Sequence, residues 1–135
     1  YVFADAPAAG EGSGLSDWAT WLSRAPESPL ARYNRAGRDI DSLFDVKVIY
    51  QQRFEDIDIM RVPPTFMPKT GPLGLTDWEK VYATLPGEDI FDIREISREG
   101  AVVLVRPDQY VAHVLPLTAI DELAAFFAQN FLPAS

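Results

Sequence analysis

The stretch AVVLVRPDQYVAHVLPL, residues 101–117, decides the fold. Its first five residues are an unbroken apolar run with three valines, short and β-branched enough to be a strand. Pro107-Asp108 follows, and a proline with its fixed φ suits the first central position of a tight turn. Tyr110 to Leu115 is apolar again, so the stretch predicts a β-hairpin. Neither strand alternates between apolar and polar residues, and we therefore expect both faces of the hairpin to be largely covered.

A helix is predicted directly after the hairpin. Pro116 closes the second strand because it cannot donate a ladder hydrogen bond. Thr118 is a suitable N-cap, and Asp121 falls in the first turn, where a carboxylate is favourable. Pro133 marks the end. The apolar residues of this helix recur at helical spacing: Ile120, Leu123, Ala124, Phe127 and Phe131.

Three segments resemble one enzyme family. RPDQYVAHVLPL (106–117), followed by ELAAFF (122–127), is similar to the C-terminal domain of flavin-dependent aromatic-ring hydroxylases, the phenol 2-monooxygenase and 3-hydroxybenzoate 4-monooxygenase group. GPLGLTDWEKVY (71–82) and GEDIFDIREISREG (87–100) match the same family. The similarity covers the chain from about Asp39 onward.

The resemblance implies a thioredoxin-like domain that lacks redox cysteines and helps its parent enzyme to form a homodimer. The parent would use FAD and NADPH, bound with the aromatic substrate in upstream domains, so the resemblance places no catalytic, cofactor-binding or metal-binding residue in this chain. The structural residues of the family motif are Arg106, Pro107, Asp108, Gln109 and Tyr110. Of these, Arg106 and Asp108 match the family best, and we expect them to build the turn: the aspartate accepts backbone N–H groups, and the arginine pairs nearby.

Composition narrows the function classes. The 135 residues suffice for one domain with a core, and no apolar run approaches the length needed to span a bilayer. A net charge of −8 disfavours nucleic-acid and anionic-membrane partners. There are no cysteines, which excludes thiol–disulfide exchange and fits a reducing cytoplasm, where we expect the protein.

The start of the chain indicates a longer parent. Tyr1-Val2-Phe3 is an unusual natural start, because an initiating methionine is normally removed only before small residues. We expect residues 1–135 to be a single thioredoxin-like domain excised from the C-terminal part of a larger flavoprotein, cut at or inside a strand.

The first half of the chain reads as strand, helix, strand. After a strand at residues 1–4, the glycines of AAGEGSG (8–14) have the spacing GxGxG, and the third glycine of a dinucleotide-binding GxGxxG falls on Leu15, so we interpret this segment as a plain loop. The helix that follows has Ser13 or Ser16 as its cap and carries Leu15, Trp18, Ala19 and Leu22 at helical spacing. The second strand is 45–51, DVKVIYQ.

The segments between these elements are polar or rich in proline. Residues 26–43 carry Arg32, Arg35 and Arg38 at three-residue intervals, which suits either an acidic partner or, as we interpret it, a solvated excursion. Prolines 63, 64, 68 and 72 predict an extended loop. We interpret three close carboxylates as exposed charge, because no EF-hand spacing or turning glycine accompanies them: Glu55, Asp56 and Asp58.

A second helix is predicted over residues 77–85. Thr76-Asp77-Trp78-Glu79 has the form of a capping box, and Pro86-Gly87 ends the segment. The element order is then strand, helix, strand, short helix, hairpin, helix. With a right-handed crossover the first two strands are parallel and the hairpin is antiparallel, giving a mixed sheet of four to five strands with flanking helices, the thioredoxin-like α/β fold without a CxxC motif.

The sequence shows no catalytic constellation. His113, the only histidine, lies in the middle of a predicted strand, where a neutral imidazole held by packing and one hydrogen bond is the simplest interpretation. We therefore expect a structural and dimerisation domain of an aromatic hydroxylase. The alternative is a free-standing thioredoxin-like module that binds another protein and has no redox activity.

Overall fold

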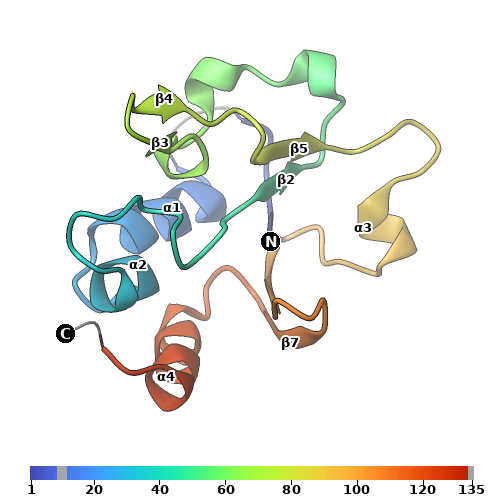
Figure 1. Cartoon of the computed structure of the whole chain (residues 1–135). Helices are drawn as coiled ribbons and strands as arrows, with labels where there is room; N and C mark the ends of the chain where they lie inside the picture. Colours follow the sequence, from blue (N-terminus) through green and yellow to red (C-terminus); the bar gives the residue numbers. More distant parts are fainter. Residues whose placement is uncertain (9–11, 134–135) are drawn as a thin grey trace.

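A mixed five-stranded sheet forms the centre of the molecule (Figure 1). The structure is a computed structural model that describes residues 1–8 and 12–133. The strand order is β5-β2-β1-β6-β7. The bounds are β1 (Val2–Phe3), β2 (Val48–Tyr50), β5 (Val81–Ala83), β6 (Ala101–Val105) and β7 (Val111–Leu115). Strands β1, β2 and β5 are mutually parallel, whereas β6 and β7 are antiparallel to their neighbours. This confirms the thioredoxin-like sheet, the parallel first strands and the antiparallel hairpin.

Helices cover the two faces of the sheet unequally (Figure 1). One face carries α1 (Gly14–Arg24), α2 (Pro29–Tyr33) and α4 (Ile120–Asn130), whereas the other carries only the one-turn helix α3 (Ile90–Ile93). Between β2 and β5 the chain makes three 3-10 turns and a small two-stranded sheet: η1 (Phe54–Asp56), η2 (Ile59–Arg61), η3 (Pro64–Phe66), β3 (Lys69–Thr70) and β4 (Leu75–Thr76).

Two apolar clusters follow from this division. The larger lies under α1, α2 and α4, where the ring planes of Trp18 and Phe66 stack at 6.5 Å. The smaller lies under α3, where the rings of Phe3 and Phe91 are perpendicular with their centroids 5.2 Å apart. Because alternate strand residues point to opposite faces, β6 supplies Val102 to the first cluster and Val103 to the second.

Helix α1 forms as its sequence predicts. Leu15, Trp18, Ala19 and Leu22 are all buried on one side. Ser13 is the N-cap, and its Oγ accepts the backbone N–H of Ser16 at 3.1 Å. The GxGxG spacing includes Gly10, which lies outside the described residues.

The helix predicted over residues 77–85 is wrong. This segment is a bend followed by β5, which pairs with β2 in the register Val48↔Val81 and Tyr50↔Ala83. Thr76 belongs to β4, and the backbone N–H of Glu79 donates instead to Asp77 Oδ1 at 2.8 Å. An Asx turn therefore replaces the capping box.

The predicted N-cap of α4 is also wrong. Helix α4 begins at Ile120 with Ala119 as its N-cap and no side-chain cap. The backbone N–H of Ala119 donates to the carbonyl of Pro116 at 3.0 Å, so a tight turn over residues 116–119 holds Thr118 one residue too early to cap the helix.

Residues 26–43 are only partly the solvated excursion that was expected. The three arginines are exposed, but Ser28 caps helix α2, which buries Leu30 and Tyr33 against the larger cluster. Tyr33 contacts Phe44, Phe127 and Phe131 with ring centroids 5.6–6.4 Å apart.

The expectation that both faces of the hairpin are covered holds for β6 only. Val102 and Val103 are buried, whereas Val111 and Val114 of β7 are 59% and 54% exposed. Strand β7 lies at the edge of the sheet, and the one-turn helix α3 packs on β1 and β6 without reaching it.

Candidate functional site

The five motif residues form the turn between β6 and β7. The backbone N–H of Arg106 donates to the carbonyl of Tyr110, and that of Gln109 donates to the carbonyl of Arg106, both at 2.9 Å. Pro107 precedes Asp108, whose Oδ1 accepts the backbone N–H of Tyr110 at 3.3 Å. Asp108 Oδ2 pairs with the Arg106 guanidinium at 2.6 Å. Gln109 takes the left-handed conformation with φ 69°. The side chains thus hold the turn, and all five residues are exposed.

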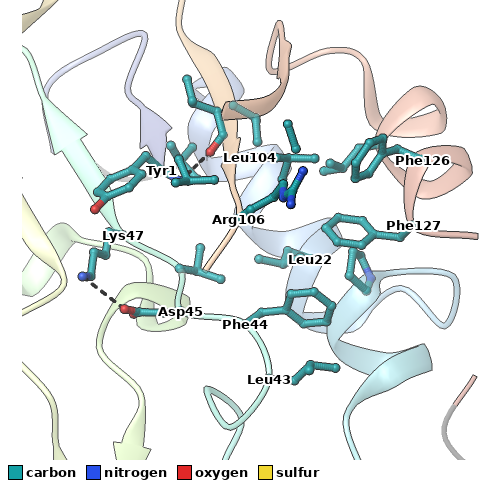
Figure 2. Close-up of a pocket in the computed structure, with 18 of the residues that line it drawn as sticks. Tyr1, Leu22, Leu43, Phe44, Asp45, Lys47, Leu104, Arg106, Phe126 and Phe127 are labelled. Atoms are coloured by element: carbon teal, nitrogen blue, oxygen red, sulfur yellow. Dashed lines mark hydrogen bonds and ion pairs between the residues drawn. The ribbon is translucent and has the colours of Figure 1, made fainter. Parts of the chain in front are cut away.

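An apolar groove of about 940 Å³ runs beside this turn. Phe126 and Phe127 of α4 lie at one end, Tyr1 and Lys47 at the other, and Leu22 of α1 lies between them (Figure 2). The volume is within the range of ligand-binding pockets. Most of the lining side chains are aliphatic or aromatic, so the groove suits an apolar segment of chain or a flat apolar molecule.

The charged groups at the groove are already paired. Arg106 pairs with Asp108, as above, and Lys47 Nζ lies 3.1 Å from Asp45 Oδ2. Burial of Asp45 favours a higher pKa, but hydrogen bonds from Lys80 and Lys47 outweigh it and hold the pKa of that carboxyl below its usual range. A carboxylate held ionised by two ammonium groups is a poor general base.

Lys80 is a buried cation that no feature of the sequence indicated. It is 6% exposed, and its Nζ lies 2.6 Å from Asp45, 3.2 Å from Asp41 and 3.4 Å from Asp77. Burial opposes the charge, but the hydrogen bonds that Lys80 donates to Asp45 and Asp41 raise its pKa above the ordinary value. Since Asp41 and Asp45 are more than thirty residues away in sequence, no local pattern indicates this cluster. It ties the segment that carries Phe44, one wall of the groove, to the start of β5.

His113 lies in β7 and packs on Phe126 at a centroid distance of 5.5 Å. Its Nδ1 accepts the backbone N–H of Val114 at 3.1 Å. In the part of the chain that the structure describes, its ring contact is with an aromatic side chain and its hydrogen bond is with the backbone. The imidazole therefore has the surroundings of a packed side chain.

The N-terminus of α1 does not fit a dinucleotide phosphate. The backbone N–H of Gly14 donates to Asp5 Oδ2 at 2.7 Å, and that of Leu15 donates to Asp5 Oδ1 at 3.1 Å. A pyrophosphate at a helix N-terminus needs these same N–H groups. Here a carboxylate occupies them and places a negative charge where the phosphate would lie, a contact that the sequence pattern did not reveal.

The three carboxylates proposed to be exposed charge are exposed, on and around the 3-10 turns η1 and η2. Arg53 pairs with Glu55, and Arg61 lies 3.4 Å from Asp58. Within residues 1–8 and 12–133, no group of three or more potential ligands is arranged to hold a metal ion. No helix in this described part is long and apolar enough to cross a membrane.

The chain is similar in sequence to part of several known monooxygenases. It is 42% identical over 126 residues to 3-hydroxybenzoate 4-monooxygenase of Comamonas testosteroni, covering 90% of this chain and 20% of that protein. It is 36% identical over 112 residues to the FAD-dependent monooxygenase terD of Aspergillus terreus, covering 77% of this chain and 18% of that protein. The FAD-dependent monooxygenase hkm7 of Aspergillus hancockii is 29% identical over 93 residues.

The matched region is a small part of each relative, since the chain spans about a fifth of the length of these curated proteins. The profile of the family described as "Phenol hydroxylase, C-terminal dimerisation domain" matches residues 1–135, the whole chain. With this fold, its surface turn at residues 106–110 and its relatives, the chain belongs to the phenol hydroxylase C-terminal dimerisation domain family.

Proposed function

We propose that this chain is the C-terminal structural domain of a cytoplasmic FAD- and NADPH-dependent aromatic-ring monooxygenase, acting on a phenol or a hydroxybenzoate, and that it holds two copies of the parent enzyme together as a homodimer. The upstream FAD-binding and substrate domains of the same parent are its other partners. The five turn residues 106–110 serve this role by fixing the hairpin, and they take no part in catalysis.

The observation that carries the proposal is the family match over residues 1–135, together with a groove whose charged groups are neutralised in pairs. Acid–base catalysis needs a titratable group with an open partner position near the substrate. Asp45, Lys47 and Arg106, the charged side chains that line the groove, are each engaged in an ion pair. The groove can bind apolar surface, and its charged side chains are all held in ion pairs.

Flavin chemistry belongs elsewhere in the parent for a separate reason. The N–H groups that a pyrophosphate would use at α1 are bonded to the Asp5 carboxylate. If preceding domains are present, they join the chain at Tyr1, which lies at the groove. The apolar groove is therefore in a suitable place to receive them.

The test is a titration of the purified chain with FAD and NADPH, following flavin fluorescence and NADPH absorbance in the presence of simple phenols. We expect no saturable flavin binding and no phenol-stimulated NADPH oxidation. Asp5→Asn is the matched variant, because it removes the charge and keeps a side-chain oxygen for the N–H groups. Saturable FAD binding by the unaltered chain, or turnover of a phenol, would contradict a purely structural domain.

A second candidate is a free-standing thioredoxin-like module that binds another protein, and the open apolar groove favours it. The two candidate functions predict different coding sequences upstream of this chain. The parent-enzyme proposal expects the reading frame upstream of Tyr1 to encode a dinucleotide-binding domain with a complete GxGxxG, whereas the module proposal expects none.

A further inference from the structure

We propose that two copies of this chain pair through the outer edge of β7, which joins their sheets antiparallel about a two-fold axis and covers Val114 on both. This inference rests on the proposed dimerisation and names the surface that performs it. The evidence comes from the backbone of β7, from its side chains and from the distribution of charge.

The backbone of Val114 faces the outer edge of the sheet. Val103 in β6 uses both of its backbone groups on β1: its N–H donates to the carbonyl of Tyr1, and its carbonyl accepts from the Tyr1 amine, each at 2.8 Å. Val114 is the β7 residue opposite Val103. In an antiparallel ladder, two opposite residues direct their backbone N–H and C=O groups either toward each other or away from each other. The groups of Val103 point away from β7, so the N–H and C=O of Val114 point away from β6, toward the outer edge of the sheet. Among the described residues, the partner of this N–H is the imidazole of the adjacent His113.

The side chain of Val114 is exposed, although the apolar sequence of its strand predicts that it is buried. Cross-strand partners share a face, so Val114 lies on the α3 side next to Val103, yet it is 54% exposed where Val103 is 9% exposed. Strand sequences without polar alternation are typical of sheets buried on both faces. Helix α3 covers β1 and β6 but not β7. The missing cover must therefore come from outside the chain.

Charge identifies a second copy as the partner that fits. Each copy carries a net charge of −8, so a contact between two copies is opposed least where the surface carries no charged side chain. Residues 109–118 contain no Asp, Glu, Lys or Arg, and β7 lies within them. Strand β5 at the opposite edge is only three residues long, and a short edge strand disfavours edge-to-edge pairing.

The symmetry of this pairing limits the assembly to two copies. An antiparallel pair formed by one edge strand and its own copy is isologous, so it produces a dimer and leaves no further β7 edge for a third copy. In the pair, the N–H of Val114 exchanges the His113 imidazole for a carbonyl of the partner subunit. This arrangement satisfies the outward backbone groups of β7 and places its exposed valines beside same-face side chains of the partner strand.

The experiment compares three forms of the 135-residue chain by sedimentation equilibrium. Val114→Lys places a charge on the proposed interface, and Leu75→Lys places the same charge on β4, where Leu75 is 66% exposed, as the matched control. We expect the dissociation constant of the dimer to rise by about 100-fold or more in Val114→Lys, because two like charges meet in a desolvated contact, and to stay unchanged in Leu75→Lys. Circular dichroism verifies that both variants are folded.

A measurement on the unaltered chain avoids dependence on variants. Hydrogen exchange of the Val114 amide should slow by at least about tenfold when the protein concentration is raised above the dissociation constant, because the amide enters an intermolecular ladder. A folded Val114→Lys that remains dimeric, a dimer lost only in Leu75→Lys, or exchange at Val114 independent of concentration would each overturn the β7 surface. A chain that stays monomeric at every concentration would instead overturn the proposed dimerisation itself.

Discussion

Two ammonium groups, the α-amine of Tyr1 and the Nζ of Lys80, both lose solvent through burial but lie in different electrostatic settings. The amine donates to one backbone carbonyl, that of Val103, at 2.8 Å. Burial lowers its pKa to about 6, with Asp45 opposing and Lys47 adding to the shift. Lys80 has three carboxylates around it, and its pKa is raised. The number of anionic partners decides whether a buried ammonium keeps its proton.

The Tyr1 amine makes the stability of the 135-residue chain depend on pH. The pKa of the amine is 8.0 in its ordinary state and about 6 in the folded chain, so between these values the unfolded chain binds more protons. The free energy of unfolding should therefore rise from pH 6 to pH 8, by at most about 2 kcal/mol after allowance for solvent screening. Urea denaturation at intervals of half a pH unit measures the effect.

N-terminal acetylation supplies the control for this prediction. The acetylated Tyr1 keeps an N–H that can donate to the carbonyl of Val103 but has no group to titrate. Its free energy of unfolding should lack the rise between pH 6 and pH 8. An equal rise in the acetylated and unmodified chains would show that other groups cause it.

Replacing Lys80 by methionine should destabilise the fold by roughly 3 kcal/mol at pH 7, because it leaves Asp41, Asp45 and Asp77 facing one another without the cation. The loss should shrink in acid. The pKa of Asp45 is lowered in the folded chain, so its contribution is present above the ordinary value of 3.8 and disappears as the pH falls through the lowered value.

Lys47→Met is the comparison for Lys80→Met, since within residues 1–8 and 12–133 the Lys47 ammonium pairs with one carboxylate, that of Asp45. It should cost less than about 1 kcal/mol, as expected of an ion pair near the surface. Equal losses in the two variants, measured by urea denaturation, would mean that the three-carboxylate cluster has no special role in holding the groove wall.

At the scale of the elements, the sequence predicted those whose pattern matches their burial. Helix α1 has its apolar stripe, its Ser13 cap and its buried face in agreement. The helix prediction for residues 77–85 is wrong because the helical spacing of the apolar residues there does not correspond to a buried face. Trp78, Val81, Tyr82 and Leu85 recur at helical spacing, yet only Val81 is buried and the others are 42–64% exposed. Pairing with β2, a contact remote in sequence, determines this strand.

The helix caps and the candidate site also show that local sequence predicts only contacts formed within a short segment. Thr118 and the Thr76–Glu79 pair have the right residue types for caps, but local turns at residues 116–119 and 77–79 use the backbone differently. In contrast, the turn at residues 106–110 could be anticipated, because all of its contacts are formed by residues within the turn. The Lys80 cluster and the Asp5 contact join distant segments and had no local signal.

The hairpin has one strand that stabilises the fold and one that is available for contact. Val103→Ala should lower the free energy of unfolding by about 1–4 kcal/mol, because Val103 is 9% exposed and lies in the smaller apolar cluster. Val114→Ala, directly opposite, should cost less than about 1 kcal/mol in the monomer, because Val114 is already 54% exposed. Urea denaturation at concentrations below the dissociation constant of the dimer compares them. An unchanged midpoint for Val103→Ala would mean that β6 is peripheral.

At the scale of the whole molecule, the apolar surface exceeds what the chain can bury by itself. One face of the sheet is covered by three helices, but α3 leaves the hairpin partly bare, and an apolar groove opens beside α4. A domain whose function is to join subunits and neighbouring domains needs such surfaces, whereas an enzyme needs converging polar groups. Among the described residues, the charged groups at the groove are in ion pairs and the apolar surfaces are open.

The most direct test of this account is the mass of the unaltered 135-residue chain in solution, measured by sedimentation equilibrium from low to high micromolar concentration. The account predicts a reversible monomer–dimer equilibrium that reaches twice the chain mass of 15.0 kDa, with a dissociation constant on the order of micromolar or tighter. A single species of 15.0 kDa at every concentration, from a chain that is folded by circular dichroism, would contradict it.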